Sequence, residues 1–189
     1  LMLSGIGPRE HLQKFGIPVI VDSPQVGKNL QDHLQLRITY RLNKPISFND
    51  QYHSYLEKIK IGMEYYIKRS GPMAYPTAQV GLFTRSSPLI DTPDIQYHFS
   101  NYTIDEKTGL PDKFPGMTFS VCHLRPQSRG EILLRSTDAD QHPRIIPNYL
   151  STAEDCRVAI EEIRLTRKIA ATEPLASVVD AELDPGPDV

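Results

Sequence analysis

The stretch Leu34 to Leu42, L-Q-L-R-I-T-Y-R-L, alternates between apolar and polar residues at every step. Successive side chains of a β-strand point to opposite faces, so its apolar residues would share one face. These residues are Leu34, Leu36, Ile38, Tyr40 and Leu42. Alternation of this kind predicts a strand of an antiparallel sheet, buried on one side and solvated on the other.

Four further strands are expected downstream, each a short run bounded by turn-forming residues. They are Gln79–Arg85, Ile95–Tyr102, Met117–Leu124 and Glu131–Arg135. Two longer stretches, 51–69 and 152–171, instead repeat apolar residues at helical spacing. We therefore predict an α+β fold, with an antiparallel sheet of about five or six strands backed by two long helices.

The first of these helices carries a row of aromatic and apolar residues. They are Tyr52, Tyr55, Leu56, Ile59, Met63 and Tyr66. Aromatic residues at helical spacing usually pack in a core, so we expect this face to be buried, with the lining of a pocket as the alternative. At the far end of the chain, residues 180–189 are acidic and contain two prolines, which predicts a frayed tail.

A ten-residue loop, Pro24 to His33 (P-Q-V-G-K-N-L-Q-D-H), comes directly before the alternating strand. Gly27 permits a left-handed backbone or a close approach by another group. The side chains of Asn29 and Asp32 can bond to loop backbone. These features predict a loop held in one irregular shape, and such loops often carry binding residues. A purely structural connection is the alternative.

Two motifs before this loop and two after it stand in a fixed order. S-G-I-G-P (4–8) and G-I-P-V (16–19) precede V-G-K-N-L-Q-D-H (26–33), and R-P-Q-S-R-G (125–130) and P-R-I-I-P-N-Y-L (143–150) follow. This order resembles the glucose-methanol-choline (GMC) oxidoreductases, flavoenzymes that oxidise alcohols, and most closely their choline-dehydrogenase-like members. The resemblance covers essentially the whole chain but only a middle part of such an enzyme.

The resemblance implies FAD as the cofactor and a small-molecule alcohol as the substrate, with hydride transfer to the flavin. It implies the end of an FAD-binding domain over 1–33, a substrate-binding domain over 34–126, and the start of a C-terminal region over 127–189. It also implies that a set of residues lies beside the flavin: Ser4, Gly5, Gly7, Gly27, Asn29, Asp32 and His33. Strand residues Gln96, His98 and Ser120 would form a wall of the substrate pocket.

No catalytic residue is assigned, because two segments of the family pattern have no match in this sequence: the dinucleotide-binding glycine motif and the C-terminal catalytic histidine. A dinucleotide site needs G-x-G-x-x-G between a strand and a helix, and Gly5-Ile6-Gly7 lacks the third glycine. We therefore expect this chain to need the remaining parts of the same enzyme and to be inactive alone. The alternative is a non-catalytic module that binds a small molecule or a protein.

Composition narrows the classes of partner. A net charge of −2, from 21 basic and 23 acidic residues, gives no electrostatic basis for binding nucleic acid. No apolar run approaches the roughly 20 residues that span a bilayer, so no transmembrane segment is expected. Cys122 and Cys156 make neither a disulfide framework nor, with the available histidines, a convincing metal site. Free thiols favour an intracellular compartment, cytoplasmic or mitochondrial.

Overall fold

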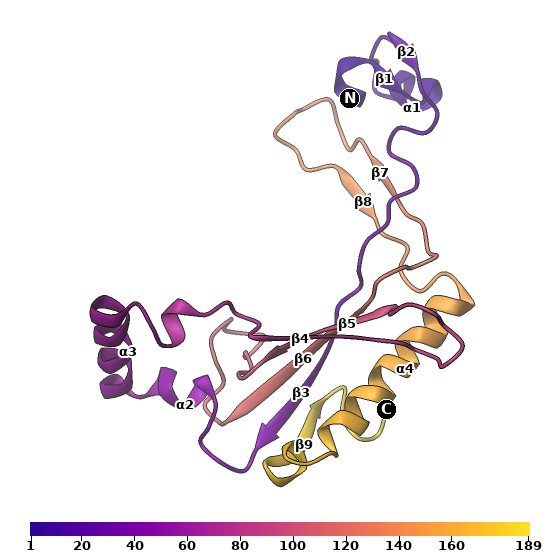
Figure 1. Cartoon of the computed structure of the whole chain (residues 1–189). Helices are drawn as coiled ribbons and strands as arrows, with labels where there is room; N and C mark the ends of the chain where they lie inside the picture. The colour runs from indigo at the N-terminus through magenta and orange to yellow at the C-terminus, as the bar shows by residue number, and fades with distance from the viewer. The chain divides into compact units, whose positions relative to one another are not determined.

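The computed structural model describes all 189 residues and divides them into two compact units (Figure 1). Unit 1 comprises Leu1–Leu34 and Arg125–Arg157, and unit 2 comprises Gln35–Leu124 and Val158–Val189. The residues after 126, which the sequence assigns to one region, are thus shared between both units. The functional roles of the three predicted regions stay predictions.

Unit 2 is built on a five-stranded sheet in which every neighbouring pair of strands is antiparallel. In spatial order its strands are β4 (Val80–Thr84), β5 (Ile95–Ser100), β6 (Gly116–His123), β3 (Leu36–Leu42) and β9 (Val179–Asp184). Three of the four strands predicted downstream of β3 belong to this sheet: β4 and β5 are each two residues shorter than predicted, and β6 has the predicted length but begins one residue earlier. Together with the helices, this sheet confirms the predicted α+β fold.

The alternation in β3 has the predicted effect. Ile38 and Tyr40 are buried, whereas Arg37 and Arg41 on the same strand are exposed. Across the ladder the buried side chains meet those of β6, and the rings of Tyr40 and Phe119 pack edge to face with centroids 6.0 Å apart. The apolar face of the sheet is therefore the core of unit 2.

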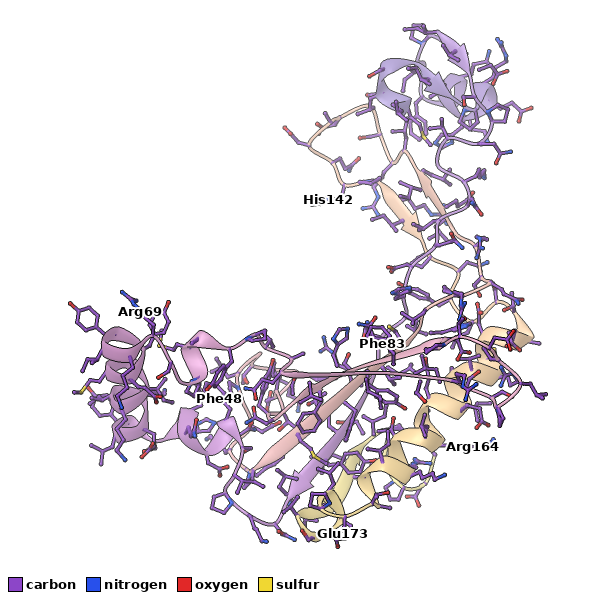
Figure 2. All side chains as sticks on the ribbon, viewed as in Figure 1. Phe48, Arg69, Phe83, His142, Arg164 and Glu173 are labelled. Atoms are coloured by element: carbon purple, nitrogen blue, oxygen red, sulfur yellow. The ribbon has the colours of Figure 1, made fainter.

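Helix α4 (Ala153–Ala170) covers this apolar face along most of its length (Figure 1). Val158 and Thr166 are fully buried, while Arg164 points away from the sheet (Figure 2). The Tyr97 hydroxyl donates to the carbonyl of Glu162 at 3.0 Å and accepts from the Thr166 hydroxyl at 3.1 Å. These bonds fix the height of the helix on the sheet, because they join β5 to two successive turns of α4.

The frayed tail predicted for residues 180–189 is wrong over its first half, because β9 pairs with β3 as an edge strand. Its acidic residues have partners that the sequence does not reveal. Arg167 Nη2 on α4 lies 2.8 Å from Glu182 Oε1, and the Thr39 hydroxyl donates to Asp184 at 2.8 Å. Charge that reads as solvent-exposed in the sequence therefore holds the strand in place.

The helix predicted over 51–69 is two helices, α2 (Phe48–His53) and α3 (Tyr55–Lys68). Ser54 separates them in an extended conformation, and its hydroxyl accepts the Glu57 N–H at 3.3 Å as the cap of α3. A residue that caps a helix has non-helical φ and ψ, so Ser54 interrupts the helix. The helical spacing of the apolar residues continues across Ser54 and therefore does not reveal this interruption.

The expectation that the aromatic face of this stretch is buried is also wrong. Helix α3 has no buried residue, and Tyr55 and Tyr66 are each 79% exposed. In Figure 1, α3 lies beyond the end of the sheet, so α4 is the helix that backs the strands. Apolar spacing predicted the helix correctly but not the surface against which it would pack.

Unit 1 consists of short elements joined by long loops. They are η1 (Met2–Ser4), β1 (Ile6–Gly7), α1 (Arg9–Lys14), β2 (Val21–Asp22), β7 (Glu131–Leu133) and β8 (Arg144–Ile146). Strands β1 and β2 pair in parallel, and β7 and β8 pair antiparallel. The predicted strand at 131–135 therefore belongs to a separate two-stranded sheet.

Two further short 3₁₀ segments, η2 (Pro72–Ala74) and η3 (Leu175–Ser177), lie in unit 2. None of the helices has both the length and the apolar character needed to cross a membrane.

Candidate functional site

The loop singled out in the sequence is fixed in unit 1 by pairing with a segment about a hundred residues downstream. Leu30 and Gly130 form an antiparallel bridge, in which the Leu30 N–H donates at 3.0 Å and the Gly130 N–H returns a bond at 2.9 Å. The Ile132 N–H donates to the Gly27 carbonyl at 2.7 Å. The V-G-K-N-L-Q-D-H and R-P-Q-S-R-G motifs, matched separately in the sequence, are therefore parts of one structure.

Glycine is required on both sides of this pairing. Gly27 has φ of 82°, and a Cβ atom there would lie 2.2 Å from the Ile132 carbonyl oxygen. A Cβ atom on Gly130 would lie 2.0 Å from the carbonyl oxygen of Ile146. Real Cβ atoms do not approach backbone oxygen so closely, so any larger residue must displace the strand beside it.

At the glycines near the start of the chain, the space that a side chain would need is likewise occupied by other atoms of this chain. Gly5 is buried with φ of 78°, and a Cβ atom there would lie 2.5 Å from the Pro18 carbonyl oxygen. Gly7 is buried against Met2, whose Cγ would lie 3.2 Å from an added Cβ atom. Ser4 ends η1 and is exposed. These two glycines explain local packing, and neither leaves an open cradle for a phosphate.

The third motif, P-R-I-I-P-N-Y-L, closes the same network. The Tyr149 hydroxyl donates to the Asp32 carboxylate, 117 residues away in the sequence. This hydrogen bond raises the pKa of Tyr149, because the charged partner favours the protonated phenol. The Asn148 side-chain amide donates to the Arg129 carbonyl at 3.0 Å. Tyr149 was not predicted as a site residue, although its motif was recognised.

A buried carboxylate holds the turn after Arg125. Asp155 accepts the N–H groups of Gln127 at 2.8 Å and of Ser128 at 2.7 Å. Burial alone would raise the pKa of Asp155, but hydrogen bonds from Ser128 and Gln127 outweigh it and keep the pKa below its ordinary value. The Ser128 hydroxyl in turn accepts the Ser151 N–H at 3.0 Å. The start of α4 is thus joined to the R-P-Q-S-R-G turn.

The polar residues predicted beside the flavin are on the surface of this network. Asn29, Asp32 and His33 are all exposed. Asn29 has φ of 60°, a left-handed conformation that asparagine adopts more readily than most residues. An ion pair between Lys28 and Glu131 pins the loop beside it to β7. The loop therefore has a rigid base and an exposed polar edge.

A cavity of about 380 Å³ lies in unit 1 and is lined mainly by η1 and by residues 132–143. Val26 and Gly27 contribute to its wall, so it shares part of the loop.

His11 lies near this cavity and accepts the Leu134 N–H through Nε2 at 3.1 Å, which requires a neutral imidazole. Burial lowers the pKa of His11, as do the charges of Lys14 and Lys28. His11 makes a structural contact that no motif or spacing in the sequence indicates.

The three residues predicted as a substrate wall lie together in unit 2. Gln96 and His98 alternate along β5 with the buried Ile95 and Tyr97, and His98 is directly opposite Ser120 in the β5–β6 register. All three side chains therefore point to the sheet face turned away from α4. Phe83 of β4 pairs with Gln96 and lies on this face in Figure 2. We call this surface the polar face of the sheet.

Gln35 is a member of this surface that sequence reasoning did not select. It precedes β3, and its amide oxygen accepts the Ser120 hydroxyl at 2.7 Å. The signal was present in the alternation, since Gln35 and Arg37 form the polar side of the stretch that predicted the strand. Its contact with Ser120, 85 residues away, was not predictable from that pattern.

Residues 126–189 match the family model described as GMC oxidoreductase. The human mitochondrial choline dehydrogenase is 40% identical over 186 residues, which are 98% of this chain and 31% of the relative. The oxygen-dependent choline dehydrogenase of Pseudomonas putida (strain GB-1) is 39% identical over 191 residues, covering all of this chain and 33% of the relative. The chain belongs to the GMC oxidoreductase family.

Solved structures of a formate oxidase and a pyridoxine 4-oxidase contain a region with the same fold as this chain. The formate oxidase of Aspergillus oryzae RIB40, in a structure concerned with FAD modification, superposes with a TM-score of 0.85 at 26% identity over 97% of this chain and 37% of the other. A pyridoxine 4-oxidase gives a TM-score of 0.75 at 24% identity, over 98% of this chain and 33% of the other. The chain spans about a third of the length of the curated relatives it matches.

Proposed function

We propose that the protein carrying this chain is an FAD-dependent oxidoreductase that converts the CH–OH group of an alcohol to a carbonyl, with a choline-like alcohol as the first candidate. The observation that carries the proposal is the joining of three GMC motifs in unit 1. Residues as far apart as Asp32 and Tyr149 hold one loop with an exposed polar edge. Identity of 37–40% to choline dehydrogenases over the whole chain supports the substrate class.

The residues of unit 1 suit one side of a flavin but not its pyrophosphate. The space beside the α-carbons of Gly5 and Gly27 is occupied by backbone oxygens of this chain, so these glycines provide no phosphate cradle. Asn29 offers an exposed amide on a rigid loop, which can donate to or accept from a ring edge. We infer that Asn29, Asp32 and His33 face the cofactor and that Ser4, Gly5, Gly7 and Gly27 shape the backbone behind them.

When bound, FAD would accept the hydride that leaves the alcohol carbon. The contribution of unit 1 is then positional: the Leu30–Gly130 bridge and the Tyr149–Asp32 hydrogen bond hold the loop in one shape, so that no ordering is needed when the cofactor binds. The contribution of unit 2 is the polar face, where Gln96, His98 and Ser120 offer hydrogen-bonding groups to the alcohol. The remaining parts of the same enzyme are its expected partners.

A substitution at Asn29 tests the cofactor assignment. Asn29→Gly removes the amide but keeps the left-handed backbone, which glycine adopts without strain. Loss of one hydrogen bond predicts roughly threefold to tenfold weaker flavin retention in the whole natural protein, measured by flavin absorbance after dialysis. Arg69→Gly is the matched control, because Arg69 has φ of 54° at the end of α3. Equal flavin retention in the two variants would contradict the assignment.

A further inference from the structure

The single hydrogen of the Ser120 hydroxyl is already engaged in a hydrogen bond within the protein. The hydroxyl donates this hydrogen to the Gln35 amide oxygen at 2.7 Å. A serine hydroxyl has one hydrogen to donate and two lone pairs with which to accept. The Gln35 bond therefore leaves Ser120 with only acceptor capacity toward any molecule on the polar face of the sheet.

Cys122 of β6 is also influenced by Gln35. Cys122 follows Ser120 by two residues on β6, so both side chains point to the same face. Burial raises the pKa of the Cys122 thiol, as does the charge of Glu162, while a hydrogen bond from Gln35 lowers it. Cys122 is thus a second residue on this face of β6 whose environment includes Gln35, while the contact with Ser120 is the one that the geometry shows.

At Ser120, a ligand on this surface could contact side chains from two neighbouring strands, β5 and β6. His98 is its direct cross-strand neighbour on β5, and neither residue is fully buried. Opposed side chains on neighbouring antiparallel strands have Cβ atoms about 5 Å apart, close enough to contact the same small group. The hydrogen-bonding polarity of Ser120 therefore bears directly on what this surface selects.

We propose that Gln35 is a specificity-determining residue, which makes Ser120 an obligate hydrogen-bond acceptor, so that the polar face selects ligands carrying an O–H donor. This inference rests on the proposed function, in which the ligand is an alcohol. An alcohol can donate to Ser120, whereas its carbonyl product and its methyl ether cannot. The contact made by the substrate is consequently lost by the product, which favours release after oxidation.

The test uses the whole natural protein and two cations that differ only in the donor. Choline carries a hydroxyl, and (2-methoxyethyl)trimethylammonium carries the methyl ether in its place. Calorimetric dissociation constants for both, measured anaerobically with the flavin already reduced so that choline binds without being oxidised, should show that the wild-type protein prefers choline by roughly threefold to tenfold, the effect of one net hydrogen bond. Ser120→Ala should bring this ratio close to one.

Variants at Gln35 separate its role from that of Ser120 itself. In Gln35→Leu the freed Ser120 hydroxyl can rotate and donate, so the ether should bind more tightly and the ratio should fall toward one with Ser120 intact. Gln35→Glu keeps the acceptor, so the ratio should return to the wild-type value even if the added charge tightens both cations. Thermal unfolding of each variant verifies that the sheet is retained.

The outcomes distinguish the two levels of the proposal. If choline is bound and oxidised but Gln35→Leu keeps the wild-type ratio, the role of Gln35 is overturned and the proposed function stands. If the flavin-loaded protein is not reduced by any alcohol and binds neither cation, the proposed function fails, and this inference fails with it.

Discussion

The close approach at Gly27 makes the sharpest prediction about stability. In Gly27→Ala the new Cβ atom would meet the Ile132 carbonyl oxygen at 2.2 Å and Met2 Cε at 2.4 Å. The left-handed φ of 82° adds about 1–2 kcal/mol of strain for alanine. Withdrawal of Ile132 also breaks its 2.7 Å bond to the Gly27 carbonyl, worth about 1 kcal/mol net. We expect about 3 kcal/mol of destabilisation in all.

The matched control is Gly16→Ala. Gly16 also has a left-handed φ, of 67°, but an added Cβ atom there meets nothing within 4 Å. The entropic effect of alanine on the unfolded chain is shared by both variants and cancels in the comparison. The difference between them therefore isolates the close approach, about 1–2 kcal/mol, or roughly 2–8 °C in Tm for a chain of this size.

The assay is thermal unfolding of both variants together with hydrogen exchange at the Ile132 amide. Gly27→Ala should unfold at the lower temperature and should expose the Ile132 N–H to faster exchange, whereas Gly16→Ala should leave that amide protected. Equal melting temperatures with equal protection at Ile132 would show that the loop is not held by this contact.

Further substitutions test other parts of the structure. Asp155→Ala removes the acceptor of two backbone N–H groups and should destabilise the turn by about 2–3 kcal/mol in urea unfolding; unchanged stability would contradict its role. Burial, with the charge of Asp94, raises the pKa of Glu162 to about 8. Between pH 4.5 and about 8 the Glu162 carboxyl is protonated in the folded protein and ionised in the unfolded chain. The free energy of unfolding should therefore decrease as the pH rises from 4.5 to about 8. Glu162→Gln should remove roughly 1 kcal/mol per pH unit of that slope, and an unaltered slope would refute the assignment. Arg167→Met breaks the ion pair to β9 and should speed exchange of the β9 amides, leaving those of β5 unchanged. Gly62→Ala, inside α3 with open space around it, should stabilise the protein by up to about 1 kcal/mol, measured in the same unfolding experiment.

What the sequence predicts best is the structure that depends on nearest neighbours along the chain. The alternation from Leu34 to Leu42 identified β3 and its buried side because the period of two is a property of the strand alone. The selection of Gln96 and His98 on β5 came instead from the family resemblance. The matching of Gln96 and His98 with Ser120 of β6 needed the register between strands, which only the structure supplies.

What the sequence misses depends on partners far along the chain. Strand β9 looked like a solvated tail because Glu182 has its partner, Arg167, on another element. Helix α3 looked like a core element because spacing gives the helical face and not what covers it. At the candidate site the motifs were recognised one by one, but the bridge between Leu30 and Gly130 joins residues in loops that have no pairing pattern of their own.

We propose above that this chain belongs to a protein that oxidises an alcohol with FAD. The most direct test of this proposal is the visible absorption spectrum of the whole protein, purified from its natural source, before and after anaerobic addition of choline. We expect a flavin spectrum that bleaches on addition of the alcohol, as the cofactor is reduced. A protein that contains no flavin, or a flavin that no alcohol bleaches, would contradict it.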